Sequence, residues 1–137
     1  MTELDSISQI LATCRTVAVV GLSPKPHRAS FDVSRYMQAH GWRIIPVNPL
    51  AAGQTILGQT VYATLLEAAR VEKIDLVNVF RNAEDVPPIV DEAIALGVPA
   101  LWLQLGITHE AAAAKARAAG LHVVQNKCLK VEHSLHT

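Results

Sequence analysis

The stretch from Gly21 to Ser30 gathers residue types that bind anions. It reads Gly-Leu-Ser-Pro-Lys-Pro-His-Arg-Ala-Ser, follows a short apolar run and precedes a segment with helical periodicity. A loop that opens a helix presents free backbone N–H groups and the positive end of the helix dipole, and both favour phosphate. Glycine lets the chain turn there, hydroxyls donate hydrogen bonds, and a guanidinium can hold a phosphate through two bonds. We therefore expect a phosphate site formed by Gly21, Ser23, Lys25, Arg28 and Ser30.

This loop departs from the dinucleotide-binding pattern G-x-G-x-x-G. The second and third glycines are missing, and two prolines stiffen the loop. An NAD site also needs an acidic residue at the end of the second strand, where this sequence has Pro46-Val-Asn-Pro49. A nicotinamide-dependent enzyme or redox sensor on the same fold is an alternative that both departures weaken. A structural subunit that has lost its ligand is a second alternative, against which the loop itself argues.

The remaining polar residues do not indicate catalysis. None of the 6 histidines has metal-ligand spacing to another histidine, a cysteine or a carboxylate, so we expect no metal site. His109-Glu110 lacks the second histidine of a zinc-protease motif and is expected to start a helix, while His40 and His122 are expected at the surface. Ser23 precedes a proline and has no G-x-S-x-G elbow. We therefore expect no catalytic residue and no enzyme activity.

The elements that must position the loop alternate between strand and helix. Apolar runs typical of buried parallel strands lie at 16–20, 42–47, 74–80, 99–104 and 121–124. Helical periodicity lies at 7–14, 31–40, 65–69, 89–96 and 110–119, with Ser6 and Ser30 as expected N-caps. Residues 54–62 are expected to be irregular, and those after 124 to form a short tail. This alternation predicts one α/β domain over 1–137: a doubly wound, Rossmann-type, five-stranded parallel sheet with helices on both faces.

Composition narrows the kinds of partner. The 12 Lys and Arg residues balance 12 Asp and Glu residues, which argues against a broad basic face for nucleic acid or an anionic membrane. The sequence starts without the basic and apolar regions of a signal peptide, and no apolar run approaches membrane-spanning length. Cys14 and Cys128 form no C-x-x-C motif, which favours reduced thiols. We expect a cytoplasmic protein with a small-molecule ligand and neither a nucleic-acid nor a membrane partner.

Several longer segments resemble one known family. They are GLSPKPHRAS, GWRIIPVNP, LGQTVY, IDLVNVFR, WLQLGI and AGLHVVQNKCLKVEH, in order from about Val17 to His133. The ordered set, which covers nearly the whole chain, resembles the stand-alone CoA-binding domain family, relatives of the CoA-binding domain of the succinyl-CoA synthetase α subunit. Lys127 stands where many relatives have arginine and lacks its planar fork. The ligase relatives need a phosphohistidine segment and a second subunit, so the resemblance implies binding of coenzyme A or an acyl-CoA without thioester synthesis.

The resemblance also implies how CoA lies along the sheet. Its pyrophosphate would sit on the loop from Gly21 to Ser30. Its adenosine end would pass Asn48, Pro49, Phe80 and Arg81, where a proline or phenylalanine face can cover adenine. Arg81 or either cation of the loop would meet the 3′-phosphate, and the sequence does not choose among them.

The pantetheine arm would run past Gln104 and Gly106, whose amide and backbone groups suit its two amides. Cys128 follows the last predicted strand on the same edge, with Lys127 and Lys130 as neighbours. A positive neighbourhood favours a thiolate, and a thiolate beside CoA can exchange with it. The stronger expectation is that Cys128 is a buried packing residue, with disulfide exchange as the alternative.

Overall fold

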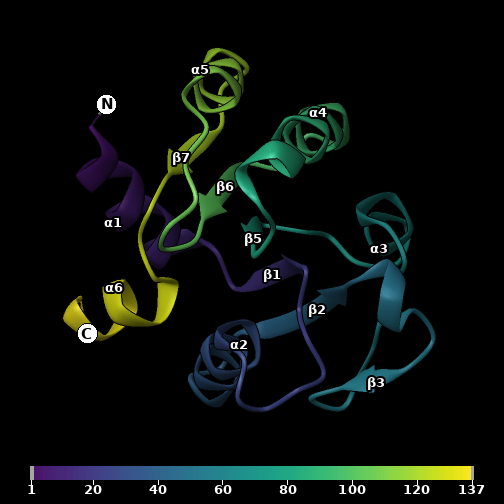
Figure 1. The fold of residues 1–137 in the computed structure, drawn as a ribbon. Helices are drawn as coiled ribbons and strands as arrows, with labels where there is room; N and C mark the ends of the chain where they lie inside the picture. Colours follow the sequence, from purple (N-terminus) through teal and green to yellow (C-terminus); the bar gives the residue numbers. More distant parts are fainter. Residues whose placement is uncertain (1, 137) are drawn as a thin grey trace.

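The computed structural model describes residues 2–136 and has a parallel sheet at its centre (Figure 1). Its strands are β1 (Thr16–Val20), β2 (Arg43–Val47), β5 (Leu76–Val79), β6 (Ala100–Leu103) and β7 (His122–Val124). They lie in the order β2-β1-β5-β6-β7, and every neighbouring pair is parallel. The predicted five-stranded parallel sheet is confirmed.

Helices cover both faces of this sheet (Figure 1). One face packs against α1 (Glu3–Thr13), α2 (Ala29–Ala39) and α6 (Leu129–Leu135), and the other against α3 (Leu65–Val71), α4 (Val86–Leu96) and α5 (Glu110–Ala118). Short 3-10 helices, η1 (Pro49–Ala51) and η2 (Ala83–Asp85), follow β2 and precede α4. The predicted doubly wound arrangement is therefore confirmed.

The sheet separates two hydrophobic cores. Successive strand residues point to opposite faces, so Val17 and Val19 join the core under α1, α2 and α6, whereas Ala18 joins the core under α3, α4 and α5. Trp102 is fully buried in the first of these cores, and its indole N–H donates to the Lys127 carbonyl at 2.8 Å. Burial of a side chain of that size contributes more than about 1.5–3 kcal/mol, the range for smaller apolar side chains. The indole bond then fixes the chain just before α6.

The strand order creates a crevice at one edge of the sheet. The chain leaves β1 for β2 on one side and later returns to β5 on the other side, so the order reverses at β1. Val20, the last residue of β1, is level with Val47 and Val79, the last residues of β2 and β5. The loops that follow these strands therefore begin side by side. Ligands of open α/β sheets bind at such a reversal, beyond the carboxyl ends of the strands.

The first helix begins earlier than its periodicity predicts. Thr2 is the N-cap of α1: its hydroxyl accepts from the Asp5 N–H at 3.1 Å, and the Asp5 carboxylate accepts from the Thr2 N–H at 3.0 Å. This reciprocal pair satisfies two backbone donors at once. Ser6, the expected cap, lies inside the helix and is buried, so that prediction is wrong.

Two further elements occupy segments without a strong sequence signal. Residues 54–62, expected to be irregular, contain a hairpin of β3 (Thr55–Ile56) and β4 (Gln59–Thr60), whose side chain of Ile56 is buried. The expected tail contains α6, which begins where the Leu129 N–H donates to the Gln104 side-chain oxygen at 3.0 Å. Both predictions are therefore corrected.

Candidate functional site

Gly21 ends β1 with a turn that a side chain cannot enter. Its φ is +91°, and its N–H donates to the Val47 carbonyl at 2.8 Å. A Cβ placed there would lie 2.6 Å from the carbonyl oxygen of Phe80 and 3.0 Å from the Cδ of Arg81. The main chain of the loop thus lies directly against the main chain that follows β5. Only glycine permits both this conformation and this approach.

Two serine hydroxyls hold the following loop in shape. The Ser30 oxygen accepts from the Ser23 N–H at 3.0 Å, and the Ser23 oxygen accepts from the Lys25 N–H at 3.1 Å. Each hydroxyl keeps its own hydrogen for a further acceptor. Ser30 was expected to cap α2, but the N-cap is Arg28, whose side chain makes no capping bond. The loop bond to Ser23 uses the Ser30 oxygen instead.

A cavity of about 350 Å³, which we call the loop cavity, lies over this turn. Its lining is Gly21, Ser23, Lys25, Arg28, Ala29, Ser30 and Phe80. All five residues predicted for the phosphate site therefore come together. The side chains of Lys25 and Arg28 are exposed, and neither has a hydrogen bond to the described part of the chain. The first N–H groups of α2 open here as well, so the cavity combines mobile cations with fixed backbone donors.

A second cavity of about 460 Å³, which we call the strand-end cavity, adjoins the first. Ala29 and Phe80 line both, so the two are continuous. The rest of its lining is Val33, Arg81, Asn82, Ala83, Gln104, Leu105, Gly106, Ile107 and Cys128. Phe80, Arg81, Gln104 and Gly106, all predicted from the sequence, meet here. This cavity is more apolar than the loop cavity because Val33, Phe80 and Ile107 contribute to it.

Several polar groups of the strand-end cavity have partners that fix their position. Arg81 pairs with Asp85 at 3.4 Å, and both side chains are partly exposed, so the pair is a weak one that can rearrange. The Gly106 N–H donates to the side chain of Asn126 at 2.7 Å. Asn126 itself has a φ of +56°, a conformation that asparagine tolerates better than most residues. The sequence gave no reason to select Asn126, since its role depends on a contact 20 residues away.

Asn48 and Pro49 lie outside both cavities. The Asn48 amide donates to the Leu22 carbonyl at 3.0 Å, and its oxygen accepts from the Leu50 N–H at 3.0 Å. The side chain thus holds the loop after β1 to the loop after β2. Pro49 is exposed beside it, at the start of η1.

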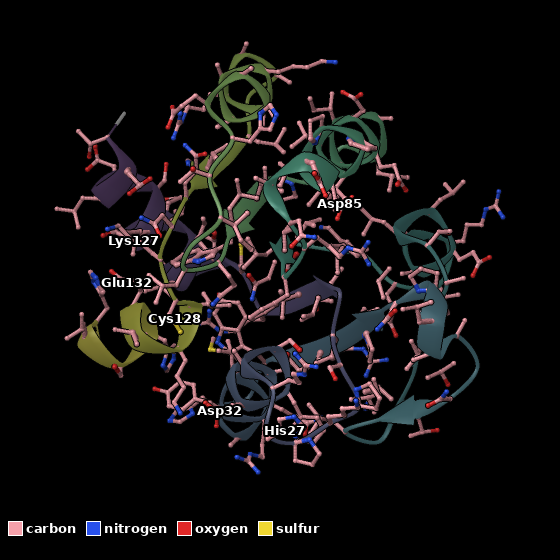
Figure 2. All side chains as sticks on the ribbon, viewed as in Figure 1. His27, Asp32, Asp85, Lys127, Cys128 and Glu132 are labelled. Carbon is pink, nitrogen blue, oxygen red and sulfur yellow. The ribbon has the colours of Figure 1, made fainter. Side chains whose placement is uncertain are left out.

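Cys128 is the lining residue whose placement differs most from expectation. It is half-buried and lies at the start of α6, beside α2 (Figure 2). It lines the strand-end cavity, so the expectation that it is a buried packing residue is wrong. The neighbouring cations do not face it alone: Lys127 pairs with Glu3 at 3.9 Å, and Lys130 pairs with Asp32 at 2.9 Å. The Lys130 bond holds the pKa of the Asp32 carboxyl below its ordinary value.

Comparison with known proteins agrees with this geometry. Residues 15–134 match the CoA binding domain family. The chain belongs to that family. The match includes the loop cavity, the strand-end cavity and most of α6, so every feature of the candidate site lies inside the family domain.

Relatives of this CoA binding domain occur in distant organisms. The uncharacterized protein YneT of Bacillus subtilis (strain 168) is 38% identical over 129 residues, which cover 94% of this chain and 93% of YneT. A solved structure from Thermus thermophilus, cell-free ID.343, is 34% identical with a TM-score of 0.90, and each chain covers 100% of the other. Acetyl-coenzyme A synthetase 1 from Candidatus Korarchaeum cryptofilum shares the fold at a TM-score of 0.70 and 21% identity, with 86% of this chain matched to 27% of that enzyme.

The histidines of the CoA binding domain lie away from both cavities. His109 caps α5, as expected, by accepting from the Ala112 N–H at 3.1 Å. His40 is exposed, as expected, but His122 is half-buried, and its Nδ1 has no hydrogen-bond partner within residues 2–136. Over the same residues, no three His, Cys, Asp or Glu side chains are grouped so that they could hold a metal ion. No helix in that range has the length and apolarity needed to cross a membrane.

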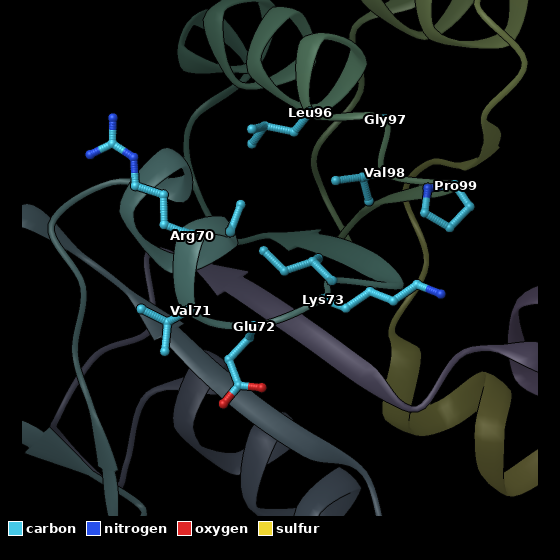
Figure 3. Close-up of a pocket in the computed structure, with 10 residues that line it drawn as sticks. Arg70, Val71, Glu72, Lys73, Leu96, Gly97, Val98 and Pro99 are labelled. Carbon is cyan, nitrogen blue, oxygen red and sulfur yellow. The ribbon is translucent and has the colours of Figure 1, made fainter.

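A further cavity of about 470 Å³ lies at the opposite edge of the sheet (Figure 3). It is lined by the segments that lead into β5 and β6, from Ala69 to Ile74 and from Leu96 to Pro99. These segments precede the amino ends of the strands, whereas the loop cavity and the strand-end cavity follow the carboxyl ends. Exposed Arg70 and Lys73 carry the positive charge there, beside Glu72. None of the residues predicted to bind ligand lines this cavity.

Proposed function

We propose that this protein binds coenzyme A or an acyl-CoA, and that it does so without catalysing a reaction. The observation that carries the proposal is the continuity of two unlike cavities at the reversal of strand order. The loop cavity is cationic and rich in N–H donors, and the strand-end cavity is longer and more apolar. CoA has the same division, since a charged nucleotide end continues into an uncharged pantetheine arm.

The loop cavity suits the pyrophosphate. The hydroxyl hydrogens of Ser23 and Ser30, the first N–H groups of α2 and the Arg28 guanidinium can converge on one group of oxygens. Lys25 and Arg81 lie on either side as candidates for the 3′-phosphate. Adenine would lie toward exposed Pro49, with Asn48 supporting the turn between them through its two backbone bonds.

The strand-end cavity suits the pantetheine arm. Phe80, at the junction of the two cavities, and Ile107 offer apolar contact to its methylene groups. Gln104 and the backbone at Gly106 offer polar partners for its two amides. An acyl group on the sulfur would extend past Leu105, whose side chain is 69% exposed.

The chemistry of the lining supports a binding role. Across the described residues, the lining of the two cavities contains cations, hydroxyls, amides and a thiol, but neither a carboxylate nor an imidazole. General acid–base catalysis near neutral pH depends chiefly on those two kinds of group. The protein is thus proposed to hold CoA rather than to transform it.

Calorimetric titration of Arg28→Ala with CoA tests the placement of the pyrophosphate. The variant loses a charge-assisted bond of about 1.5–3 kcal/mol, which corresponds to a tenfold to hundredfold weaker affinity. Arg70→Ala is the matched control, because Arg70 is an exposed arginine at the opposite edge of the sheet (Figure 3). Equal affinity of the Arg28→Ala variant and the wild type would remove Arg28 from the site.

Titration with NAD separates the proposal from a nicotinamide-dependent function. An NAD site needs a carboxylate at the end of β2 to accept from the ribose hydroxyls. Asn48 occupies that place, and its side chain already bonds to Leu22 and Leu50. We expect CoA to bind more tightly than NAD. Tighter binding of NAD would overturn the proposed function and leave the fold unaffected.

A further inference from the structure

The two cysteines of this chain lie in very different surroundings. Cys14 is 3% exposed, and its thiol donates to the Asp75 carbonyl at 3.5 Å. Burial raises the pKa of the Cys14 thiol to about 11, so that it stays protonated and out of reach of solutes. Cys128 is half-buried and lines the strand-end cavity. Only the second thiol is therefore placed to meet a bound molecule.

Gln104 gives that end of the cavity a defined polar character. The residue is 4% exposed and lines the strand-end cavity together with Cys128. Its side-chain oxygen accepts from the Leu129 N–H at 3.0 Å, directly after Cys128 in the chain. Its side-chain nitrogen has no hydrogen bond to any residue from 2 to 136. A buried amide donor without a partner is costly, and a ligand carbonyl next to the thiol would satisfy it.

The main chain at Cys128 is held by contacts to β6. Two consecutive groups of β6 and its end bond to it: the Trp102 indole to the Lys127 carbonyl at 2.8 Å, and the Gln104 side chain to the Leu129 N–H. The Glu132 N–H also donates to the Cys128 carbonyl at 3.0 Å. The sulfur therefore starts from a fixed backbone position, which lowers the entropy lost when it reacts with a docked partner.

We propose that Cys128 forms a reversible mixed disulfide with coenzyme A docked in the two cavities. The inference rests on the proposed function, since the pyrophosphate on the loop cavity is what directs the sulfur of the ligand to Cys128. The last polar group before that sulfur is an amide, and Gln104 is the donor that meets its carbonyl. The protein would thus store CoA when disulfides accumulate and release it when thiols are restored.

The step is a thiol–disulfide exchange with CoA disulfide, the symmetrical disulfide of two CoA molecules, as co-reactant. The Cys128 thiol loses its proton to solvent, and the thiolate attacks the sulfur of the docked half. The bond between the two CoA sulfurs breaks as the bond to Cys128 Sγ forms. The second CoA leaves as a thiolate and takes up a proton. One disulfide replaces another, so no further oxidant is needed.

Intact mass spectrometry after incubation with CoA disulfide tests the step. We expect the wild type to gain one CoA moiety, to carry it on Cys128 by peptide mapping, and to lose it on addition of a thiol reductant. Cys128→Ser should gain none. An adduct on Cys14, or no adduct at all, would overturn the inference. Peptide mapping of the wild type decides the question even where the variant folds poorly.

A second comparison separates directed exchange from general thiol reactivity. At CoA disulfide concentrations below saturation, Arg28→Ala should react about tenfold to hundredfold more slowly, in proportion to its loss of affinity. With hydroxyethyl disulfide, which has no phosphate, the two proteins should react at the same rate. Equal ratios of the two rates in both proteins would refute docking-directed exchange.

Calorimetry of the wild type with CoA in the presence of reductant distinguishes the two proposals. Binding there without an adduct from CoA disulfide leaves the proposed function in place and overturns this inference alone. Absence of binding there overturns the proposed function, and any adduct on Cys128 would then be undirected.

Discussion

Substitution of Gly21 by alanine tests whether contact between main chains shapes the site. The added methyl group would meet the Phe80 carbonyl oxygen at 2.6 Å, the Cδ of Arg81 at 3.0 Å and the Phe80 carbonyl carbon at 3.2 Å. The side chain of Arg81 can move away, since it is partly exposed. The Phe80 carbonyl cannot do so alone, because the Phe80 N–H donates to Val20 at 2.9 Å and holds that peptide to β1.

Two terms make up the expected loss of stability. A non-glycine residue at the φ of +91° costs about 1–2 kcal/mol. Overpacking against a backbone that cannot yield costs a further 1–3 kcal/mol or so. Gly41→Ala is the control, because Gly41 has a φ of +88° and nothing within 4 Å of its would-be Cβ. It should therefore lose the first term alone.

Equilibrium unfolding in urea measures the difference between Gly21→Ala and Gly41→Ala. We expect Gly21→Ala to be less stable by about 1–3 kcal/mol, a shift of roughly 1 M in the midpoint for a domain of this size. CoA affinity should fall in Gly21→Ala and stay unchanged in Gly41→Ala. Equal midpoints for the two variants would show that the strand ends separate freely, and the close approach would then carry no structural weight.

Two further predictions concern histidines. Burial, aided by His40, lowers the pKa of His133, whose Nδ1 lies 2.9 Å from the Tyr36 hydroxyl. The unfolded chain then binds the proton more readily, so this contribution to stability is complete above the ordinary pKa of 6.5 and is lost as the pH falls through the folded value. Urea midpoints between about pH 8 and pH 5 should show this decline in the wild type and less of it in His133→Gln, and parallel profiles would contradict it. His109→Ala removes the cap of α5 and should cost about 1 kcal/mol in the same assay, against no change for exposed His27→Ala.

The sheet and the phosphate loop could be predicted because their signals are local. A strand covered on both faces is a continuous apolar run, as at Val17 to Val19, and needs no knowledge of its neighbours. The loop residues lie within ten positions of one another, so their convergence follows from chain proximity and from the helix that they open. The lining of the loop cavity was therefore almost completely predictable.

The hairpin and α6 depend on information that the local sequence lacks. The hairpin turn has a positive φ at both Leu57 and Gly58, a geometry for which asparagine or aspartate before glycine is the usual signal. Leucine at that position hides the turn. The last helix has one buried residue, Leu129, and its first N–H is satisfied by Gln104 from 25 residues away. Cys128 was misplaced for the same reason, since its exposure follows from where α6 docks.

The contact between Gly21 and the Phe80 carbonyl gives the site a fixed internal length. Phe80 is the residue that both cavities share, and Gly21 lines the one that would take the pyrophosphate. The interval from the anion position to the start of the arm is set by main-chain atoms and by the spacing of β1 and β5. Relatives can then exchange the side chains farther along, at positions such as Leu105 and Ile107, and select different acyl groups without recalibrating that interval. The sheet acts as the ruler, and the variable side chains read what lies beyond its end.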